Sequence, residues 1–139
     1  MKFPLIKNNI TKYDINEVIK FLKTNPILTQ NIKVKQFESN WSRWLGVKYS
    51  VFVNSSSSAN LISISCLKQL GLSGEIIVPA LTWISDIVSV NLFGFKPVFV
   101  DVNFNNLSMK IDEVKKKINK KTIAIFLTHA QGFNGLTKE

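Results

Sequence analysis

The chain has 139 residues, of which 45% are hydrophobic and 19% are charged, and this composition excludes a disordered chain and suits a folded domain. Its single cysteine, Cys66, excludes an internal disulfide and a cysteine-rich metal site. The formal net charge is +9, yet Arg43 is the only arginine, so the side chain that most often contacts base edges is almost missing and we expect no nucleic-acid partner.

The first third of the chain predicts two amphipathic helices. The first covers residues 14–24, with Asp14 as its capping residue and Pro26 beyond its end. The second covers residues 34–45 and ends at Gly46. Each has an apolar stripe, formed by Ile15, Val18, Ile19 and Leu22 in the first helix and by Phe37, Trp41, Trp44 and Leu45 in the second.

Strands and helices alternate after residue 47. We expect strands over 48–54, 75–79, 96–102 and 122–129, and helices over 56–70, 83–94 and 111–118. The inward helix faces should comprise Ala59, Ile62, Cys66 and Leu70, then Ile84, Ile87, Val88 and Leu92. Alternation of apolar strands with helices predicts an α/β fold, with a mostly parallel sheet flanked by helices. No apolar run is long enough to span a bilayer and no signal peptide is recognisable, so we expect a cytoplasmic protein.

Ligands of such sheets bind beyond the carboxyl ends of the strands, which here are residues 54–58, 79–83, 101 and 128–132. At the first end, Ser55 to Ser58 open a helix. Their hydroxyls and the free N–H groups of a helix N-terminus suit either a simple N-cap or a bound phosphate. Neither GxxxxGK[ST] nor GxGxxG is present, and the residues alone leave both interpretations open.

The other three strand ends carry one candidate each. Trp83 offers a flat indole for stacking on a planar ring, or it packs in a core or interface. Asp101 is expected to form a capping or turn hydrogen bond. His129, the only histidine, has no partners for a catalytic triad, and Gly132 and Gly135 beyond it indicate a tight backbone path.

Taken together, these segments resemble the N-terminal part of the DegT/DnrJ/EryC1/StrS family of sugar-nucleotide aminotransferases, which use pyridoxal 5′-phosphate (PLP). Residues 28–136 carry the resemblance, in the segments VKQFESNWSRWLGVKYSVFVNSSSSANL, EIIVPALTWISDIVSVNLFGFKPVFVDV and IDEVKKKINKKTIAIFLTHAQG. The resemblance implies an N-terminal helical arm over residues 1–30. It also implies that residues 31–139 form an incomplete large domain of a fold-type I PLP-dependent transferase.

The resemblance also implies roles for individual residues. The family's phosphate-binding triplet maps onto Ser55, Ser56 and Ser57, so that Ser56 and Ser57 hold the cofactor phosphate and Ser55 supports them. Ser56 stands where the family has glycine. Trp83 matches the aromatic residue that stacks on the pyridine ring. His129 and Gly132 match the family's H-x-x-G in a supporting position, and no metal is implied.

For the parent protein, the resemblance implies a homodimer that transfers an amino group from a donor such as glutamate to a keto-sugar nucleotide, in the biosynthesis of deoxy-amino sugars and polysaccharides. In this family the Schiff-base lysine and the acid that protonates the pyridine nitrogen follow the matched segment. We therefore expect no catalytic residue in this chain and no turnover by the chain alone. The alternatives are a PLP-dependent sugar 3-dehydratase of the same family, in which histidine replaces the lysine, and a non-catalytic binding remnant.

Overall fold

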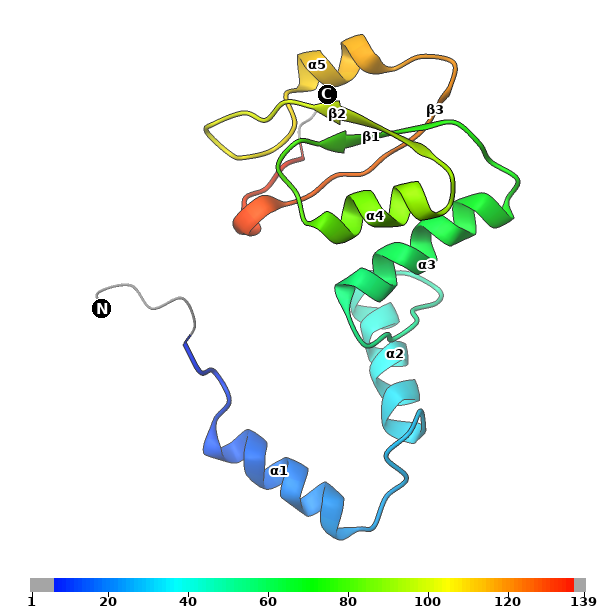
Figure 1. Ribbon diagram of the computed structural model, residues 1–139. Helices are drawn as coiled ribbons and strands as arrows, with labels where there is room; N and C mark the ends of the chain where they lie inside the picture. Colours follow the sequence, from blue (N-terminus) through cyan, green and yellow to red (C-terminus); the bar gives the residue numbers. More distant parts are fainter. Residues whose placement is uncertain (1–6, 137–139) are drawn as a thin grey trace. The chain divides into compact units, whose positions relative to one another are not determined.

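The computed structural model describes residues 7–136, which belong to two compact units with a boundary between Phe52 and Val53. The elements of the first unit are α1 (Lys12–Lys23) and α2 (Ile32–Leu45). Those of the second unit are α3 (Ser56–Gln69), β1 (Glu75–Pro79), α4 (Ile84–Leu92), β2 (Lys96–Val100), α5 (Ile111–Lys117), β3 (Thr122–Ile125) and the short 3-10 helix η1 (Ala130–Gly132) (Figure 1). None of these helices is long and apolar enough to cross a membrane. The expected division of the parent protein at residue 30 stays a prediction.

Helix α1 begins earlier than predicted because Thr11, rather than Asp14, is its N-cap. The Thr11 Oγ1 atom accepts a hydrogen bond from the Asp14 N–H at 3.2 Å, and the Asp14 carboxylate accepts one from the Thr11 N–H at 2.8 Å. This reciprocal pair is a capping box, which satisfies two helix-end donors at once. Helix α2 ends as predicted, with Gly46 in the left-handed conformation at a φ of 77°.

Residues 48–54 do not form the predicted buried strand, and Val51 and Phe52 are exposed. An extended segment becomes a strand only when a neighbouring strand exchanges hydrogen bonds with it. The strands of the described residues pair only with one another, in the order β2-β1-β3. The segment is instead held to α2, because the Phe52 N–H donates to Glu38 Oε1 at 2.8 Å and the Phe52 ring packs edge-on against Phe37.

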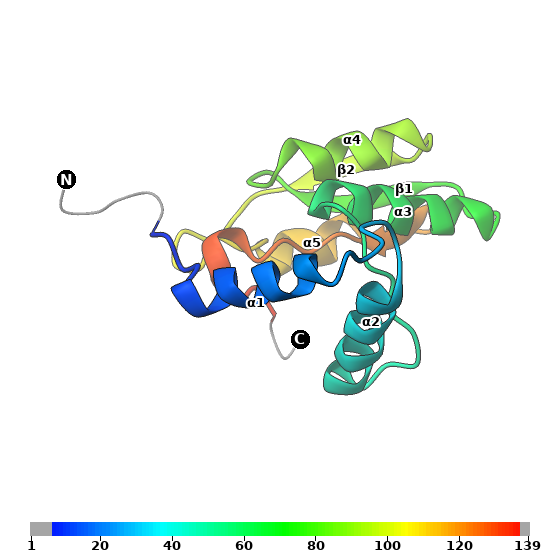
Figure 2. The same cartoon turned by 90° about the horizontal axis from the view of Figure 1, so that it is seen from below.

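The second unit confirms the parallel α/β fold. Strand β1 is central and pairs in parallel with β2, from Glu75 opposite Lys96 to Pro79 opposite Val100, and with β3 on its other side. Helix α5 lies on one face of the sheet and α4 on the other (Figure 1), and α3 runs alongside α4 (Figure 2). Alternate β1 residues therefore enter two cores, which comprise Ile64, Ile76, Val78, Val90 and Phe95 on the first face and Ile77, Val100, Met109 and Val114 on the second.

Helix α3 presents a different face to the core from the predicted one. Ile64 is buried and Leu67 packs beside it, whereas Ile62, Cys66 and Leu70 are exposed. Apolar side chains surround most of this helix, and spacing alone then gives no preference for one face.

Helix α4 also departs from prediction, because it buries polar groups and exposes apolar ones. Ile87 packs against the core as expected, but Ile84, Val88 and Leu92 are exposed. The buried positions are Asp86, Ser89 and Val90. A polar cluster inside the unit, described below, accounts for this reversal.

Strands β2 and β3 end earlier than predicted, at Val100 and Ile125. Two backbone hydrogen bonds close the carboxyl edge of the sheet, from the Ala80 N–H to the Val100 carbonyl oxygen and from the Phe126 N–H to the Ile77 carbonyl oxygen, both at 2.8 Å. Beyond these bonds the three connections leave the sheet as loops. Their side chains form the candidate site.

Candidate active site at the carboxyl edge of the sheet

The serine run divides into capping residues and free residues. Ser55 is the N-cap of α3, and its Oγ atom accepts a hydrogen bond from the Ser58 N–H at 3.2 Å. The Ser58 hydroxyl donates to Asn54 Oδ1 at 2.6 Å. The capping interpretation is therefore correct for Ser55, and Ser58 and Asn54 reinforce the cap.

Ser56 and Ser57 occupy the first two helical positions and are exposed. Within residues 7–136 their hydroxyls form no hydrogen bond, and their N–H groups are among those that an α-helix leaves without an internal partner. The backbone at Ser56 does not have positive φ, so a serine fits without strain at the position where the family has glycine. This end of α3 offers hydroxyl and amide donors together with the positive end of a helix dipole.

Trp83 precedes the first residue of α4 and is 71% exposed, so it is not a core residue. It lines a cavity of about 160 Å³. The other lining residues are Leu81, Thr82, Thr128, Ala130 and Gln131, so the cavity lies between the loops that follow β1 and β3. An exposed indole beside a small cavity can stack on a planar ligand.

His129 and Gly132 shape the loop that follows β3. The His129 Nδ1 atom accepts a hydrogen bond from the Gly135 N–H at 3.0 Å. Gly132 has a φ of 83° and the preceding Gln131 a φ of 54°, so the chain turns sharply here. The tight path is clearest at Gly135, where an added Cβ atom would lie 2.3 Å from Ser108 Oγ. His129 thus orders the loop through a backbone contact.

Asp101 forms the expected turn hydrogen bond. Its Oδ1 atom accepts from the Val102 N–H at 2.8 Å, and Oδ2 accepts from Lys110 Nζ at 2.6 Å. The hydrogen bond from Lys110 and the one from the Val102 N–H hold the pKa of the Asp101 carboxyl below its ordinary value. Asp101 therefore fixes the loop after β2.

A buried carboxylate that the sequence did not predict as a site residue lies at the centre of this edge. Asp86, on the first turn of α4, is 3% exposed. Its Oδ1 atom accepts from Asn60 Nδ2 at 2.7 Å and from Ser85 Oγ at 3.3 Å. Its Oδ2 atom accepts from Thr128 Oγ1 at 3.1 Å and from the Thr82 hydroxyl.

The Asp86 cluster brings the strand ends together. Asn60 belongs to the second turn of α3, Thr82 follows β1 and Thr128 follows β3, and all three side chains meet on one carboxylate. The N-terminal turns of α3 and α4 are therefore neighbours, which places the Ser56 and Ser57 end of α3 on the same edge as Trp83. The only hint in the sequence was that Asp86 interrupts the apolar pattern of α4. This hint does not reveal which residues bind the carboxylate.

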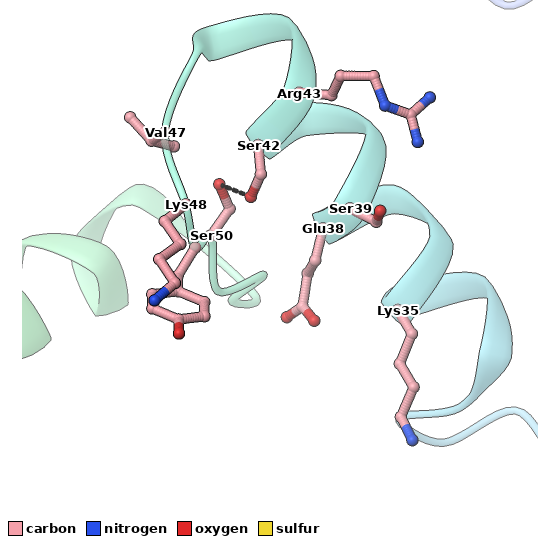
Figure 3. A pocket seen from close by; sticks show the side chains of 9 residues that line it. Lys35, Glu38, Ser39, Ser42, Arg43, Val47, Lys48 and Ser50 are labelled. Carbon is pink, nitrogen blue, oxygen red and sulfur yellow. Dashed lines mark hydrogen bonds between the residues drawn. The ribbon is translucent and has the colours of Figure 1, made fainter.

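A separate polar hollow of about 480 Å³ lies in the first unit (Figure 3). Lys35 and Glu38 lie on α2, and Lys48 and Ser50 lie on the segment that follows it. The two sides are joined by a hydrogen bond of 2.8 Å between the hydroxyls of Ser42 and Ser50. None of the predicted site residues lines this hollow.

Comparison with known proteins identifies the class. The model of the DegT/DnrJ/EryC1/StrS aminotransferase family matches residues 8–134, and the chain belongs to this family. The chain is 31% identical to a GDP-4-keto-6-deoxy-D-mannose 3-dehydratase from Yersinia pseudotuberculosis, over 99% of this chain and 37% of that protein. It is also 31% identical to a UDP-4-amino-4-deoxy-L-arabinose–oxoglutarate aminotransferase from Shewanella sediminis, over 93% of this chain and 33% of that protein.

A solved structure agrees with this assignment. The fold matches the E. coli GDP-4-keto-6-deoxy-D-mannose 3-dehydratase with bound hydrated PLP, with a TM-score of 0.82 and 30% identity over 90% of this chain and 33% of that chain. The chain thus spans about a third of the length of the curated relatives that it matches. The similarity covers the sheet edge described above and extends over both compact units.

The division of the serine run makes a prediction for stability. Ser55→Ala should lower the free energy of unfolding by about 1 kcal/mol, because α3 loses its N-cap. Ser57→Ala should change it by less than about 0.5 kcal/mol, because the Ser57 hydroxyl is exposed and unbonded. Urea denaturation of both variants measures the difference. Equal losses would contradict the assignment of capping to Ser55.

Proposed function

We propose that this chain forms the phosphate-binding part of the active site of a cytoplasmic PLP-dependent enzyme that acts on nucleotide sugars. The parent activity is amino transfer to a keto-sugar nucleotide, with an amino donor such as glutamate. In this proposal the parent protein works as a homodimer. Membership of the family and the unbonded donors of Ser56 and Ser57 support this proposal.

The residues present fit the cofactor. A phosphate needs several convergent donors, and Ser56 and Ser57 supply two N–H groups and two unbonded hydroxyls at the positive end of a 14-residue helix. An aromatic ring needs a flat apolar surface, and the exposed indole of Trp83 provides it on the same edge of the sheet. When bound, PLP supplies an electron sink for carbanion chemistry.

This chain's own contribution is binding and orientation. The Ser56 and Ser57 N–H groups and the Ser57 hydroxyl hold the phosphate, and Trp83 fixes the plane of the ring. Ser55 keeps the donors in place through the cap, and His129 holds the loop up to Gly135 against the edge. In this proposal the amine that attaches the cofactor comes from elsewhere, and a cavity lining of six residues without a lysine is consistent with that.

A sugar 3-dehydratase is the second candidate. Dehydratases and aminotransferases occur among the relatives at the same 31% identity. As the resemblance implies, the two activities differ at one residue beyond the matched segment. This residue is a lysine that binds the cofactor covalently in the aminotransferases and a histidine that does not in the dehydratases. Ser56, Ser57 and Trp83 serve either activity, so the proposal for these residues holds in both cases.

Isothermal titration of the 139-residue chain with PLP tests the cofactor assignment. We expect saturable binding that Ser57→Ala weakens about tenfold, since a hydrogen bond to a charged group is lost. Ser39→Ala is the matched control, because Ser39 lines the separate hollow of the first unit. The Ser39→Ala chain should bind PLP with the same affinity as the unmodified chain. No binding, or equal binding by the Ser57→Ala chain, would disprove the assignment.

The absence of a lysine from the cavity lining predicts that the chain does not attach PLP covalently at this site. The chain should be incubated with PLP, reduced with borohydride, and analysed by intact mass and peptide mapping. We expect only scattered, substoichiometric labelling of surface lysines. One lysine labelled at a stoichiometry near one would show that this chain itself carries the attachment residue.

A further inference from the structure

Among the residues that the structure describes, the buried Asp86 carboxylate has no cationic partner. All four side chains that donate to it, Asn60, Thr82, Ser85 and Thr128, are neutral. None of the ion pairs within residues 7–136 includes Asp86. Buried charges in proteins are normally paired, because neutral donors offset only part of the cost of removing a charge from water. A cation that binds beside this carboxylate would therefore gain a favourable interaction with its charge.

The Asp86 carboxylate also fixes which hydrogen-bonding groups the neighbouring threonines offer. The Oγ1 atoms of Thr82 and Thr128 lie 2.8 Å apart, and both contact Asp86 Oδ2. Each hydroxyl has one proton, and a carboxylate accepts but does not donate. Both protons are used within this triangle, so the lone pairs that remain on the two hydroxyl oxygens can only accept.

Both threonines line the cavity beside Trp83. A ligand there meets two acceptors 2.8 Å apart, the Asp86 carboxylate that both of them contact, and the exposed side chain of Trp83. Two acceptors this close converge on a single donor atom, and an ammonium group can donate to both because it has three N–H bonds. An aromatic face adds further attraction for a cation. The other lining residues, Leu81, Ala130 and Gln131, bring no competing positive charge.

We propose that the cavity between Thr82, Trp83 and Thr128 binds a primary ammonium group. Asp86 is the positioning residue that makes the cavity prefer an ammonium group over a neutral group. This inference rests on the proposed function, in which amine-bearing forms of the cofactor and the amino donor enter the same site. The ammonium donates to the two threonine hydroxyls. Asp86 acts through those hydroxyls and supplies the opposite charge.

Two cofactor analogues test this selectivity by isothermal titration of the 139-residue chain. Pyridoxamine 5′-phosphate and pyridoxine 5′-phosphate share the ring and the phosphate, and they differ in having an aminomethyl or a hydroxymethyl group. We expect the amine to bind at least about tenfold more tightly, because hydrogen bonds to a charged group exceed those to a neutral one. Equal affinities would overturn the inference and leave the phosphate site intact, whereas binding of neither compound would overturn the proposed function as well.

Variants then assign the preference to the cluster. Asp86→Asn keeps the shape and removes the charge, and Thr128→Val removes one acceptor. In each variant the amine compound should bind less than about threefold more tightly than the hydroxyl compound. Asp86→Asn removes the charge that strengthens the hydrogen bonds, and Thr128→Val removes one of these bonds. A merely structural role would weaken both compounds alike and leave the ratio of the two affinities unchanged, and that result would overturn the inference. Circular dichroism verifies folding, and Thr128→Val serves if the Asp86→Asn chain does not fold.

Two further variants are matched controls. Asp112→Asn changes the net charge by the same amount at an exposed position on α5, and it should preserve the ratio. Ser57→Ala should weaken both compounds equally, because both carry the phosphate. A ratio that changes as much in Asp112→Asn as in Asp86→Asn would show a long-range charge effect and would contradict a positioning role for Asp86.

Discussion

The carboxyl edge of the sheet depends on the buried carboxylate of Asp86. Four side chains from α3, α4 and the loops after β1 and β3 donate to it, so one group fixes the separation of elements that are distant in sequence. The two apolar cores hold the helices against the sheet, and Phe126 and Leu127 pack against them just beyond β3. The Asp86 cluster adds a polar link between the loops, and on α4 Asp86 and Ser89 are buried whereas Ile84, Val88 and Leu92 are exposed.

A second constraint acts at the start of α3, where one serine run serves two purposes. Ser55, Ser58 and Asn54 satisfy one another and close the helix end. This leaves Ser56 and Ser57 with donors that nothing else uses in the described residues. Anion binding therefore needs no rearrangement of the cap. The two constraints meet through Asn60, which lies on α3 and donates to Asp86, so the Ser56 and Ser57 end of α3 is linked to the first turn of α4 beside Trp83.

The sequence predicted the order and type of nearly all elements, because helix stops such as Gly46 and apolar strands such as 75–79 have strong local causes. It failed over residues 48–54, since strand formation needs a neighbour that local sequence does not contain. It also predicted the wrong face of α3, where apolar residues surround the helix, and of α4, where Asp86 and Ser89 are buried. Of the site, the serine run at the start of a helix was predictable, but the residues alone left open which serines form the cap and whether Trp83 is exposed or packed. The partners of Asp86 were not predictable, because Asn60 and Thr128 come from elsewhere in the chain and meet it only in the folded sheet.

One crystal structure of the chain with pyridoxamine 5′-phosphate would decide whether the edge of this sheet is a cofactor site. We expect the phosphate oxygens within hydrogen-bonding distance of the Ser56 and Ser57 amides, with the ring against the Trp83 indole and the amine against Thr82 and Thr128. A ligand bound through surface lysines elsewhere, with both threonines and the α3 end bare, would contradict the account.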